Sequence, residues 1–465
     1  MSVSVDERPT TATDAEGAPL DGEHREVIVV GGGQAGLATS WWLRERGVEH
    51  VVLEQHGIGH AWRNARWDTF CLVTPNWQCR LPGFPYSGDD PLGFMVRNEI
   101  VAYLEAYAGS FDPPLVTGVT VSALLPATAE DPEGARYRLE TSAGTLTAGQ
   151  VVVATGPYHR PTIPRAAERL PADVTQVHSS EYRNPEQLPT GAVLVVGSGQ
   201  SGAQIAEDLH LAGRRVHLAT GSAPRVARFY RGRDCTAWLE DMGHYDLPVD
   251  RHPLGEGVRR NKNHYVTGRG GGHDIDLRAF ARDGMRLYGR LLDVASTPDG
   301  AVVRLGDDLR TNLDRADEVS ESIKDGIDRW IDEHGIDAPM EARYEPLWEP
   351  ADGPGEIDLA AEGIRTVVWA IGFSSSWPWV RLPVFEGSGY PTHERGVTSV
   401  PGCYVVGLPW LHTWGSGRFA TVGPDAEHVV DRVLALAAPA EEALRGCAAA
   451  PDLRESGRVE RPRCR

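Results

Sequence analysis

The sequence predicts an α/β fold with two Rossmann-like dinucleotide-binding domains. An apolar run, a glycine-rich turn, a helical segment and a second apolar run follow one another over residues 26–54, and the same order returns over residues 192–219. The first glycines of the two turns, Gly31 and Gly197, lie 166 residues apart, and the other landmarks keep this offset. A pattern that recurs at a fixed offset indicates a repeated structural unit rather than a chance cluster of glycines.

The first repeat is predicted to form a strand, a tight turn, a helix and a second strand. Gly31 permits the turn, Gly33 lets the backbone approach a pyrophosphate, and Gly36 lets the helix pack on the strand. Glu54 ends the second strand, where an acid accepts hydrogen bonds from a ribose 2′-hydroxyl. The predicted nucleotide-binding residues of this repeat are Gly31, Gly33, Gln34, Ala35, Gly36, Glu54 and Gln55.

The second repeat differs from the first at the end of its second strand. Thr220 stands at the position that corresponds to Glu54, and Ser222 and Arg225 follow it. An acid there would repel a 2′-phosphate, whereas a hydroxyl with a nearby arginine accommodates one. The first repeat therefore suits FAD, and the second suits NADPH rather than NADH. The predicted NADPH residues are Gly197, Gly199, Gln200, Ser201, Gly202, Thr220, Ser222 and Arg225, with Arg228, Arg231 and Arg233 as alternative phosphate ligands.

Three further apolar runs are predicted to be buried strands that end in small residues. One ends at Ala154-Thr155-Gly156, a second at Ala370-Ile371-Gly372, and a third lies at residues 402–409. Small residues suit places where the chain passes close to a bound nucleotide. The second and third runs are expected to return the chain to the first nucleotide domain.

An aromatic and proline-rich segment over residues 59–86 is predicted to line a pocket, because loops this apolar are seldom solvated linkers. Trp62, Arg63 and Thr74 are its candidate cofactor contacts, although each tryptophan could equally cap a core. Further along, helices are predicted over residues 97–107, 308–334 and 424–434, and residues 235–272 are expected to form an irregular loop or lid over the cleft.

These elements predict four parts of the chain. Residues 1–24 and 438–465 are expected to be loose tails, the first of them too polar for a secretion signal. Residues 25–165 together with 360–437 are expected to form the FAD domain. Residues 166–359 are expected to form the NADPH domain.

Composition excludes several classes of function. The formal net charge of −19 disfavours nucleic acid and anionic membrane surfaces. No run of roughly eighteen apolar residues predicts a membrane span. The six cysteines include no C-x-x-C pair, so neither a zinc site nor a redox disulfide is indicated, and a reducing cytoplasm is expected. No metal site is predicted.

The glycine turns, the Trp62-Arg63 pair, the Leu72-to-Pro82 loop and the Ala154-Thr155-Gly156 strand end together resemble the class B flavoprotein monooxygenases. This group includes flavin-containing monooxygenases, YUCCA enzymes and Baeyer–Villiger enzymes, and the segments at residues 67–85, 231–234 and 276–278 look most like its bacterial flavoprotein oxidoreductases. The resemblance implies a glutathione-reductase-like two-domain architecture with FAD and NADPH. It also implies catalytic roles for Asn76, as the nearest equivalent of a flavin-supporting asparagine, and for Arg63, on the cofactor phosphates or the nicotinamide side.

The chemistry implied by the resemblance is monooxygenation of a small soluble molecule. NADPH reduces FAD, oxygen adds at flavin C4a, and the resulting peroxide delivers one oxygen atom, which is expected to go to nitrogen or sulfur. Baeyer–Villiger or oxidative decarboxylation chemistry, a flavin-dependent NAD(P)H oxidoreductase or dehydrogenase that does not oxygenate, and a redox-sensing nucleotide binder remain alternatives. The partners expected are the substrate and O2, and the sequence leaves a homodimer open.

Overall fold

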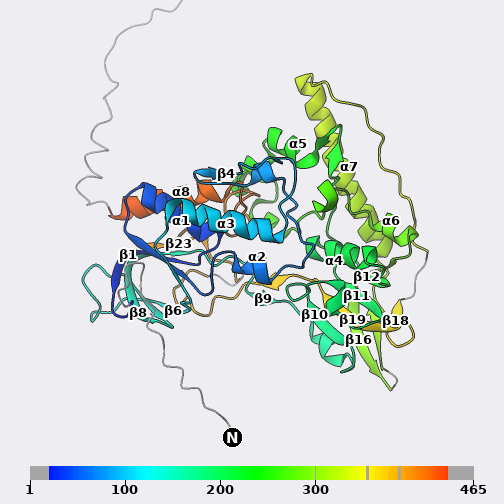
Figure 1. The fold of residues 1–465 in the computed structure, drawn as a ribbon, viewed down its shortest axis with the longest axis horizontal. Helices are drawn as coiled ribbons and strands as arrows, with labels where there is room; N and C mark the ends of the chain where they lie inside the picture. The colour runs from blue at the N-terminus through cyan, green and yellow to red at the C-terminus, as the bar shows by residue number, and fades with distance from the viewer. Residues whose placement is uncertain (1–19, 299, 352–354, 386–388, 438–465) are drawn as a thin grey trace, which may run out of the picture.

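Two β-sheets, one in each half of the molecule, carry the two glycine turns (Figure 1). The first sheet is mixed and the second is parallel throughout. The computed structural model of the protein describes residues 20–298, 300–351, 355–385 and 389–437. The predicted α/β fold with two nucleotide-binding units is confirmed by the order and the direction of the strands.

The first sheet has nine strands and is built around a parallel centre in the order β23-β8-β1-β2-β5. Strands β21 and β22 extend it at one edge, and β7 and β6 pair antiparallel beside β8. The strands are β1 (His24–Val30), β2 (His50–Glu54), β5 (Leu115–Thr117), β6 (Val121–Pro126), β7 (Tyr137–Thr141), β8 (Gly144–Val153), β21 (His393–Glu394), β22 (Val397–Thr398) and β23 (Cys403–Val405).

The second sheet has five parallel strands in the order β10-β19-β11-β12-β15. They are β10 (Thr175–His178), β11 (Ala192–Val196), β12 (Val216–Ala219), β15 (Arg286–Tyr288) and β19 (Ile364–Trp369). A separate antiparallel sheet, β16 (Leu291–Thr297), β17 (Gly300–Leu305) and β18 (Glu356–Asp358), lies beside it in the same half of the molecule (Figure 1). Two-stranded pairs join β3 (Arg80–Leu81) to β4 (Phe84–Pro85), β13 (Phe229–Tyr230) to β14 (Arg233–Asp234), and β9 (Arg160–Pro161) to β20 (Phe373–Ser374).

The neighbours of the turn-bearing strand are equivalent in the two sheets. In the first sheet, β1 lies between β2 and β8, and in the second, β11 lies between β12 and β19. The strand β19 is therefore the counterpart of β8. The expectation that residues 366–373 return the chain to the FAD domain is wrong, because β19 pairs with β10 and β11 along its length. The expectation for residues 402–409 is confirmed, because β23 pairs with β8.

The helices cover the sheets and connect the halves. They are α1 (Gln34–Glu45), α2 (His60–Asn64), α3 (Arg97–Phe111), α4 (Gln200–Leu211), α5 (Cys235–Asp241), α6 (Leu277–Arg282), α7 (Leu309–His334) and α8 (Val422–Ala437). Leu37 and Leu43 of α1 share a buried cluster with Val429, Val430 and Val433 of α8, so the C-terminal helix closes the first domain (Figure 1). The segment over residues 235–272 is less irregular than expected, since it contains α5 and four short 3-10 turns.

Residues 20–24, which were predicted to belong to the N-terminal tail, are part of the first domain. Leu20 is fully buried in the core beside β1 and β8, Gly22 N–H donates to the Thr145 carbonyl, and β1 begins at His24. Residues 1–19 and 438–465, the rest of the two predicted tails, lie outside the described residues. Among the described helices, none is both long and apolar enough to cross a bilayer.

A buried ionic network fixes the long helix α7 to the second domain. Arg225 and Arg278 both reach Asp317 of α7, at 2.6 Å and 2.9 Å. Both arginine side chains are almost fully buried, and Arg278 also contacts Asp314. Buried charges are tolerated only where they are paired, so this network makes α7 part of the domain rather than an appendage.

We predict that Asp317→Ala lowers the free energy of unfolding by about 3 kcal/mol, because it leaves Arg225 without this buried partner. The loss should be at the low end of the range for broken buried ion pairs, since Arg278 still pairs with Asp314. The matched change Asp325→Ala removes a partner of Arg343 that is half exposed, and it should cost less than about 1 kcal/mol. Chemical denaturation of both variants checks the difference. Equal losses would show that the network adds nothing beyond surface pairing.

Candidate functional site

The first glycine turn is held by close contacts between backbone atoms. A β-carbon on Gly31, which has φ +110°, would lie 2.7 Å from the Ala154 carbonyl oxygen, and one on Gly36 would lie 1.8 Å from the Gly31 carbonyl oxygen. A β-carbon on Gly33, by contrast, would meet no protein atom within 4 Å. Gly31 and Gly36 are therefore required by the packing of the protein backbone, because any side chain there would overlap it. Gly33 instead borders open space at the start of α1.

The second turn repeats this geometry position by position. A β-carbon on Gly197 would lie 2.6 Å from the Ala370 carbonyl oxygen, one on Gly202 would lie 1.9 Å from the Gly197 carbonyl oxygen, and one on Gly199 would meet nothing. Gly33 and Gly199 are the N-cap residues of α1 and α4, and neither helix start has a side-chain cap. Free N–H groups beside open space are what a pyrophosphate requires. Both turns therefore fit a dinucleotide.

Glu54 is fixed at the end of β2 by two backbone hydrogen bonds. Its carboxylate accepts hydrogen bonds from Gly32 N–H at 2.7 Å and from His56 N–H at 2.9 Å. In the second repeat, Ser198 occupies the place of Gly32, and its hydroxyl oxygen accepts from Gly221 N–H at 2.9 Å. Thr220 stands at the position of Glu54, so the second repeat lacks that carboxylate at this edge. This agrees with a second nucleotide that carries more negative charge.

The predicted ligands of the 2′-phosphate are placed elsewhere by the structure. The Thr220 hydroxyl is buried and donates to the Tyr288 carbonyl. Arg225 is buried under the Tyr344 ring and paired with Asp317. The alternative ligands Arg228 and Arg231 are also buried, against Asp234 and Asp328. Their roles as phosphate ligands are corrected accordingly, because each side chain is committed to the fold.

A cation that the sequence analysis missed lies at the end of β12. The Lys262 ammonium is 3.5 Å from the Ser222 hydroxyl, and it is the atom nearest to a β-carbon built on Gly221. Both Lys262 and Ser222 are exposed. Lys262 comes from a loop 42 positions after Thr220 in the sequence, so no local motif could have indicated it.

The remaining predicted nucleotide residues surround the two turns. The Gln34 amide donates to the Gly417 carbonyl at 3.1 Å, and the Gln200 amide donates to the Val266 carbonyl at 2.6 Å. Each glutamine thereby ties its helix start to a distant loop. Ala35, Ala154 and Ala370 are buried, Gly156 and Gly372 have positive φ, and Gln55, Thr155 and Ser201 are exposed.

Arg63, expected to contact the cofactors, is paired with an acid of the protein. Its half-exposed side chain pairs with Glu105 of α3 at 2.6 Å. Arg66, three residues later, stacks on Trp62 at 5.1 Å and on Phe70 at 5.5 Å, and desolvation by burial lowers its pKa. Arg66, rather than Arg63, is therefore the guanidinium packed against the aromatic rings of this loop.

Asn76 holds the aromatic loop together rather than lining a site. Its amide donates to the Asp90 carbonyl at 3.0 Å and accepts from Met95 N–H at 2.7 Å. With both ends of the amide bound to the main chain, its predicted catalytic role is corrected. Thr74 and Gln78, two positions before and two positions after Asn76 in the sequence, line a cavity instead.

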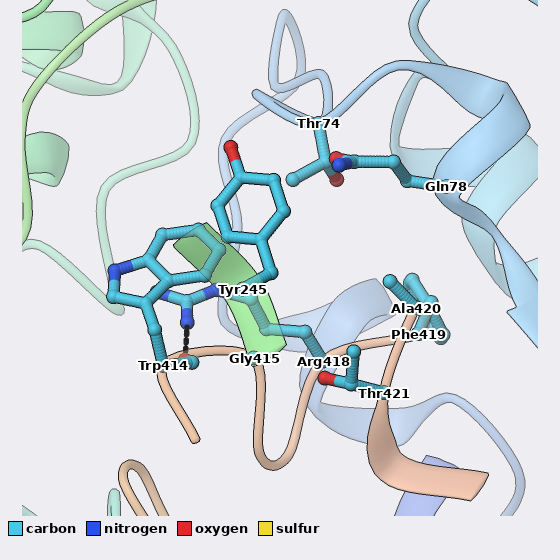
Figure 2. A pocket seen from close by; sticks show the side chains of 9 residues that line it. All are labelled: Thr74, Gln78, Tyr245, Trp414, Gly415, Arg418, Phe419, Ala420 and Thr421. Atoms are coloured by element: carbon cyan, nitrogen blue, oxygen red, sulfur yellow. Dashed lines mark hydrogen bonds between the residues drawn. The ribbon is translucent and has the colours of Figure 1, made fainter. Parts of the chain in front are cut away.

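This cavity lies where the aromatic loop, the segment after α5 and the chain before α8 converge (Figure 2). Tyr245 and Trp414 stack with ring centroids 4.7 Å apart and form one wall, and Thr74 and Gln78 lie across from them (Figure 2). The space inside it is about 10 Å³, which is room for about one water molecule. Its lining residues are Thr74, Gln78, Tyr245, Trp414, Gly415, Arg418, Phe419, Ala420 and Thr421.

Arg418 and Tyr245 line the cavity, His244 and His264 lie near them, and the Glu240 carboxylate stands beside Gln78 of the lining. Burial lowers the pKa of Arg418 to about 10, so the guanidinium stays protonated at neutral pH. Burial and the neighbouring His244 and Arg418 lower the pKa of His264 to about 4. Burial also lowers the pKa of His244 and raises the pKa of Tyr245. Near neutral pH the histidines are uncharged and the tyrosine is a hydrogen-bond donor.

The described cysteines are buried free thiols rather than a redox pair. They are Cys71, Cys79, Cys235 and Cys403. Burial raises the pKa of Cys71, and it raises those of the other three to about 12. Reactive thiols need a lowered pKa and access, so these four are inert. Within the described ranges, no group of three or more metal-binding side chains comes together.

Comparison with known proteins agrees with this geometry. Residues 28–240 match the sequence profile of the family described as pyridine nucleotide-disulphide oxidoreductase. An uncharacterized CzcO-like oxidoreductase of Geobacillus kaustophilus is 32% identical over 88% of this chain and 98% of its own. The indole-3-pyruvate monooxygenase YUCCA4 of rice is 34% identical, over 43% of this chain and 49% of its own. A flavin-containing monooxygenase from Stenotrophomonas maltophilia has the same fold, with a TM-score of 0.62 at 20% identity over 90% of this chain and all of its own.

The fold and the paired turns define a flavoprotein oxidoreductase with two dinucleotide sites. More particularly, the chain belongs to the family of CzcO-like oxidoreductases. The predicted enzyme class, a flavin-dependent oxidoreductase of the flavin monooxygenase group that uses FAD and NADPH, is confirmed.

We predict that Gly33→Ala and Gly199→Ala leave the thermal unfolding temperature of the cofactor-free protein unchanged, because neither β-carbon meets a protein atom. Gly33→Ala should lose FAD, whereas Gly199→Ala should keep FAD and raise the KM for NADPH by at least roughly tenfold. Flavin absorbance per polypeptide and steady-state kinetics check this. Retained FAD in the first variant, or lost FAD in the second, would refute the assignment of the turns.

We predict that Lys262→Ala raises the KM for NADPH by about tenfold, the value of one charge-assisted contact, while the KM for NADH stays the same. Parallel steady-state kinetics with both coenzymes measure the effect, and NADH serves as the internal control because it lacks the 2′-phosphate. An equal change for both coenzymes would place the phosphate elsewhere.

Proposed function

We propose that this protein is an FAD- and NADPH-dependent monooxygenase that transfers one oxygen atom from O2 to a nitrogen or sulfur atom of a small molecule. The observation that carries the proposal is the composition of the cavity. Aromatic walls and neutral hydrogen-bond donors meet there, and the described cysteines are inert thiols. A disulfide reductase with the same double-nucleotide plan needs a reactive cysteine pair, whereas an oxygenase needs an enclosed site.

The residues would act by binding, orientation and exclusion of water. The turn at Gly31–Gly36 with Glu54 would hold FAD, and the turn at Gly197–Gly202 with Ser222 and Lys262 would hold NADPH. Bound FAD, once reduced by NADPH, supplies the chemistry that activates oxygen. The protein would position the reacting molecules and exclude water from them.

Gln78 and Tyr245 would orient the reacting molecules in the cavity. The Gln78 side chain is nearly fully buried, and its amide nitrogen is 3.5 Å from Glu240 Oε2, at the limit of a hydrogen bond. The raised pKa of Tyr245 keeps its hydroxyl protonated, so it donates rather than abstracts a proton. The Trp414 and Phe419 rings cover the walls and would exclude bulk water, which protects reactive oxygen species from side reactions.

The proposal predicts that the FAD-loaded enzyme incorporates one atom of ¹⁸O2 into a product while it oxidises one NADPH. A panel of small thioethers and amines, incubated with NADPH under ¹⁸O2 and read by mass spectrometry, tests this. Heteroatom oxygenation adds one labelled atom and keeps every carbon, whereas oxidative decarboxylation loses carbon dioxide. Equal NADPH oxidation with ferricyanide in the absence of oxygen, together with no label in any product, would favour a reductase instead.

A further inference from the structure

We propose that Gly268 is a positioning residue for hydride transfer between the two nucleotides. It belongs to a glycine-rich loop of the second domain, the 265–273 loop, whose contact with the first domain fixes α1 and α4 relative to one another. The inference rests on the nucleotide places of the proposed function and not on oxygenation, because NADPH reduces FAD in a reductase as well. The transfer moves a hydride, with its two electrons, from NADPH to FAD, and leaves NADP⁺ and reduced FAD.

The 265–273 loop approaches the first domain more closely than a side chain would allow. A β-carbon on Gly268 would lie 2.3 Å from the Leu72 carbonyl oxygen and 2.5 Å from Cγ of the Phe94 ring. A β-carbon on Gly272 would lie 2.9 Å from Cε2 of the same ring. The backbone of Gly268 has φ −97°, a value open to any L-residue. The contact with the first domain, and not the turn, therefore requires glycine at this position.

The Phe94 ring of the first domain is enclosed by the second domain. Besides the two glycines, the guanidinium carbon of Arg228 lies 4.9 Å from the centroid of the ring. Arg228 also donates to the Val73 carbonyl of the aromatic loop at 2.6 Å, and it pairs with Asp234 of its own domain at 2.6 Å. Because Arg228 is almost fully buried, the two domains are joined here by contacts that exclude water.

Behind this contact, the 265–273 loop is bound to α4. The Gln200 amide, at the first residue of the helix, donates to the Val266 carbonyl at 2.6 Å and accepts from Val266 N–H at 3.3 Å. Two turns further along the helix, Asp208 pairs with Arg269 at 2.9 Å. Asp208 also accepts from the Thr69 hydroxyl of the aromatic loop at 2.7 Å, which links α4 directly to the first domain. A displacement of the loop would therefore displace the helix that would hold NADPH.

The first domain is held equally firmly on its side of the contact. Leu72 is buried in the core cluster that contains the apolar residues of α1, and its N–H donates to the Met95 carbonyl at 2.9 Å. Trp67 of the aromatic loop is buried instead in the core cluster of the second domain. Next to it, Asp68 N–H donates to the Arg183 carbonyl at 2.7 Å. The Leu72 bond lies within the first domain, whereas the Asp68 bond crosses between the domains.

Hydride transfer depends on this arrangement because the reacting atoms must approach to about 3–3.5 Å. A β-carbon at position 268 lies about 1 Å too close to the Leu72 carbonyl for an ordinary contact, which begins at 3.4 Å. Since each side of the contact is bound to its own domain, this room is gained by separating the domains. A misplacement of about 1 Å costs roughly a hundredfold in rate.

The test compares Gly268→Ala with a matched change in the same domain. In the control, Gly257→Ala, the β-carbon would meet only the Arg260 and Leu254 side chains, at 3.7 Å and 3.9 Å. Phe94→Leu is a second test variant, because it removes the enclosed ring without introducing a clash. The three variants thus separate a wedge at the interface, a loosened interface and a neutral alanine.

Two measurements are made on each variant. With FAD bound and oxygen absent, stopped-flow absorbance gives the limiting rate constant of flavin reduction and the dissociation constant for NADPH. In the cofactor-free protein, hydrogen–deuterium exchange gives the protection of the Asp68 amide, with the Leu72 amide as the internal reference. The second measurement reports on the interface without any contribution from the cofactors.

We expect Gly268→Ala to lower the limiting rate constant of flavin reduction by roughly ten- to a hundredfold, with FAD content and the dissociation constant for NADPH unchanged. Phe94→Leu should lower it by roughly three- to tenfold, and Gly257→Ala should match the wild type. In the cofactor-free protein, Gly268→Ala should speed the exchange of the Asp68 amide and leave that of Leu72 unchanged.

A wild-type rate constant of flavin reduction in Gly268→Ala would overturn the inference. So would a loss that appears in FAD content or in the affinity for NADPH rather than in the rate constant, because the loop would then serve binding. If Gly268→Ala fails to fold, Phe94→Leu decides by the same two criteria.

The outcome is distinguishable from failure of the proposed function, because flavin reduction is measured without oxygen. Slowed reduction in Gly268→Ala of an enzyme that never incorporates labelled oxygen would support the role of Gly268 and reject the monooxygenase. Labelled products together with unchanged reduction in Gly268→Ala would support the monooxygenase and reject the role of Gly268.

Discussion

Contact between a glycine turn and the neighbouring strand end is the constraint on which the rest of this structure depends. Gly31 approaches the Ala154 carbonyl and Gly197 the Ala370 carbonyl so closely that a β-carbon would overlap them. These close contacts lie between β1 and β8 and between β11 and β19. At both places the chain has crossed to the other side of the strand that precedes the glycine turn. Because each helix then starts with uncapped N–H groups beside open space, the same constraint that builds the fold also builds the two nucleotide sites.

The two halves share this geometry and differ in their charges. A carboxylate, Glu54, stands at the ribose edge of the first site, whereas Ser198, Ser222 and the ammonium of Lys262 stand at the second. The cavity at Tyr245 and Trp414 is assembled from segments more than 150 residues apart in the sequence. In the proposed function, the repeats would select the nucleotides and the loops would select the substrate.

Local patterns in the sequence predicted the features that depend on the local conformation of the backbone. The glycine turns, α7 and the buried strand ends were predictable, because their periodicity and small residues act over a few positions. The interaction partners of individual side chains were not predictable. Arg63 pairs with Glu105, Arg225 pairs with Asp317 and the Asn76 amide bonds the main chain. Proximity to a motif in the sequence does not reveal such partners. The membership of β19 was also mistaken, because one strand pattern serves equally in either sheet and pairing is a tertiary property.

The central claim is that the two equivalent turns bind two different nucleotides on either side of a substrate cavity. A crystal structure of the protein with FAD and NADP⁺ both bound tests this most directly. The account predicts the FAD pyrophosphate against Gly33 at the start of α1, and the NADP⁺ pyrophosphate against Gly199 with its 2′-phosphate beside Lys262. NADP⁺ at the first turn, or a second turn that stays empty at saturating NADP⁺, would contradict it.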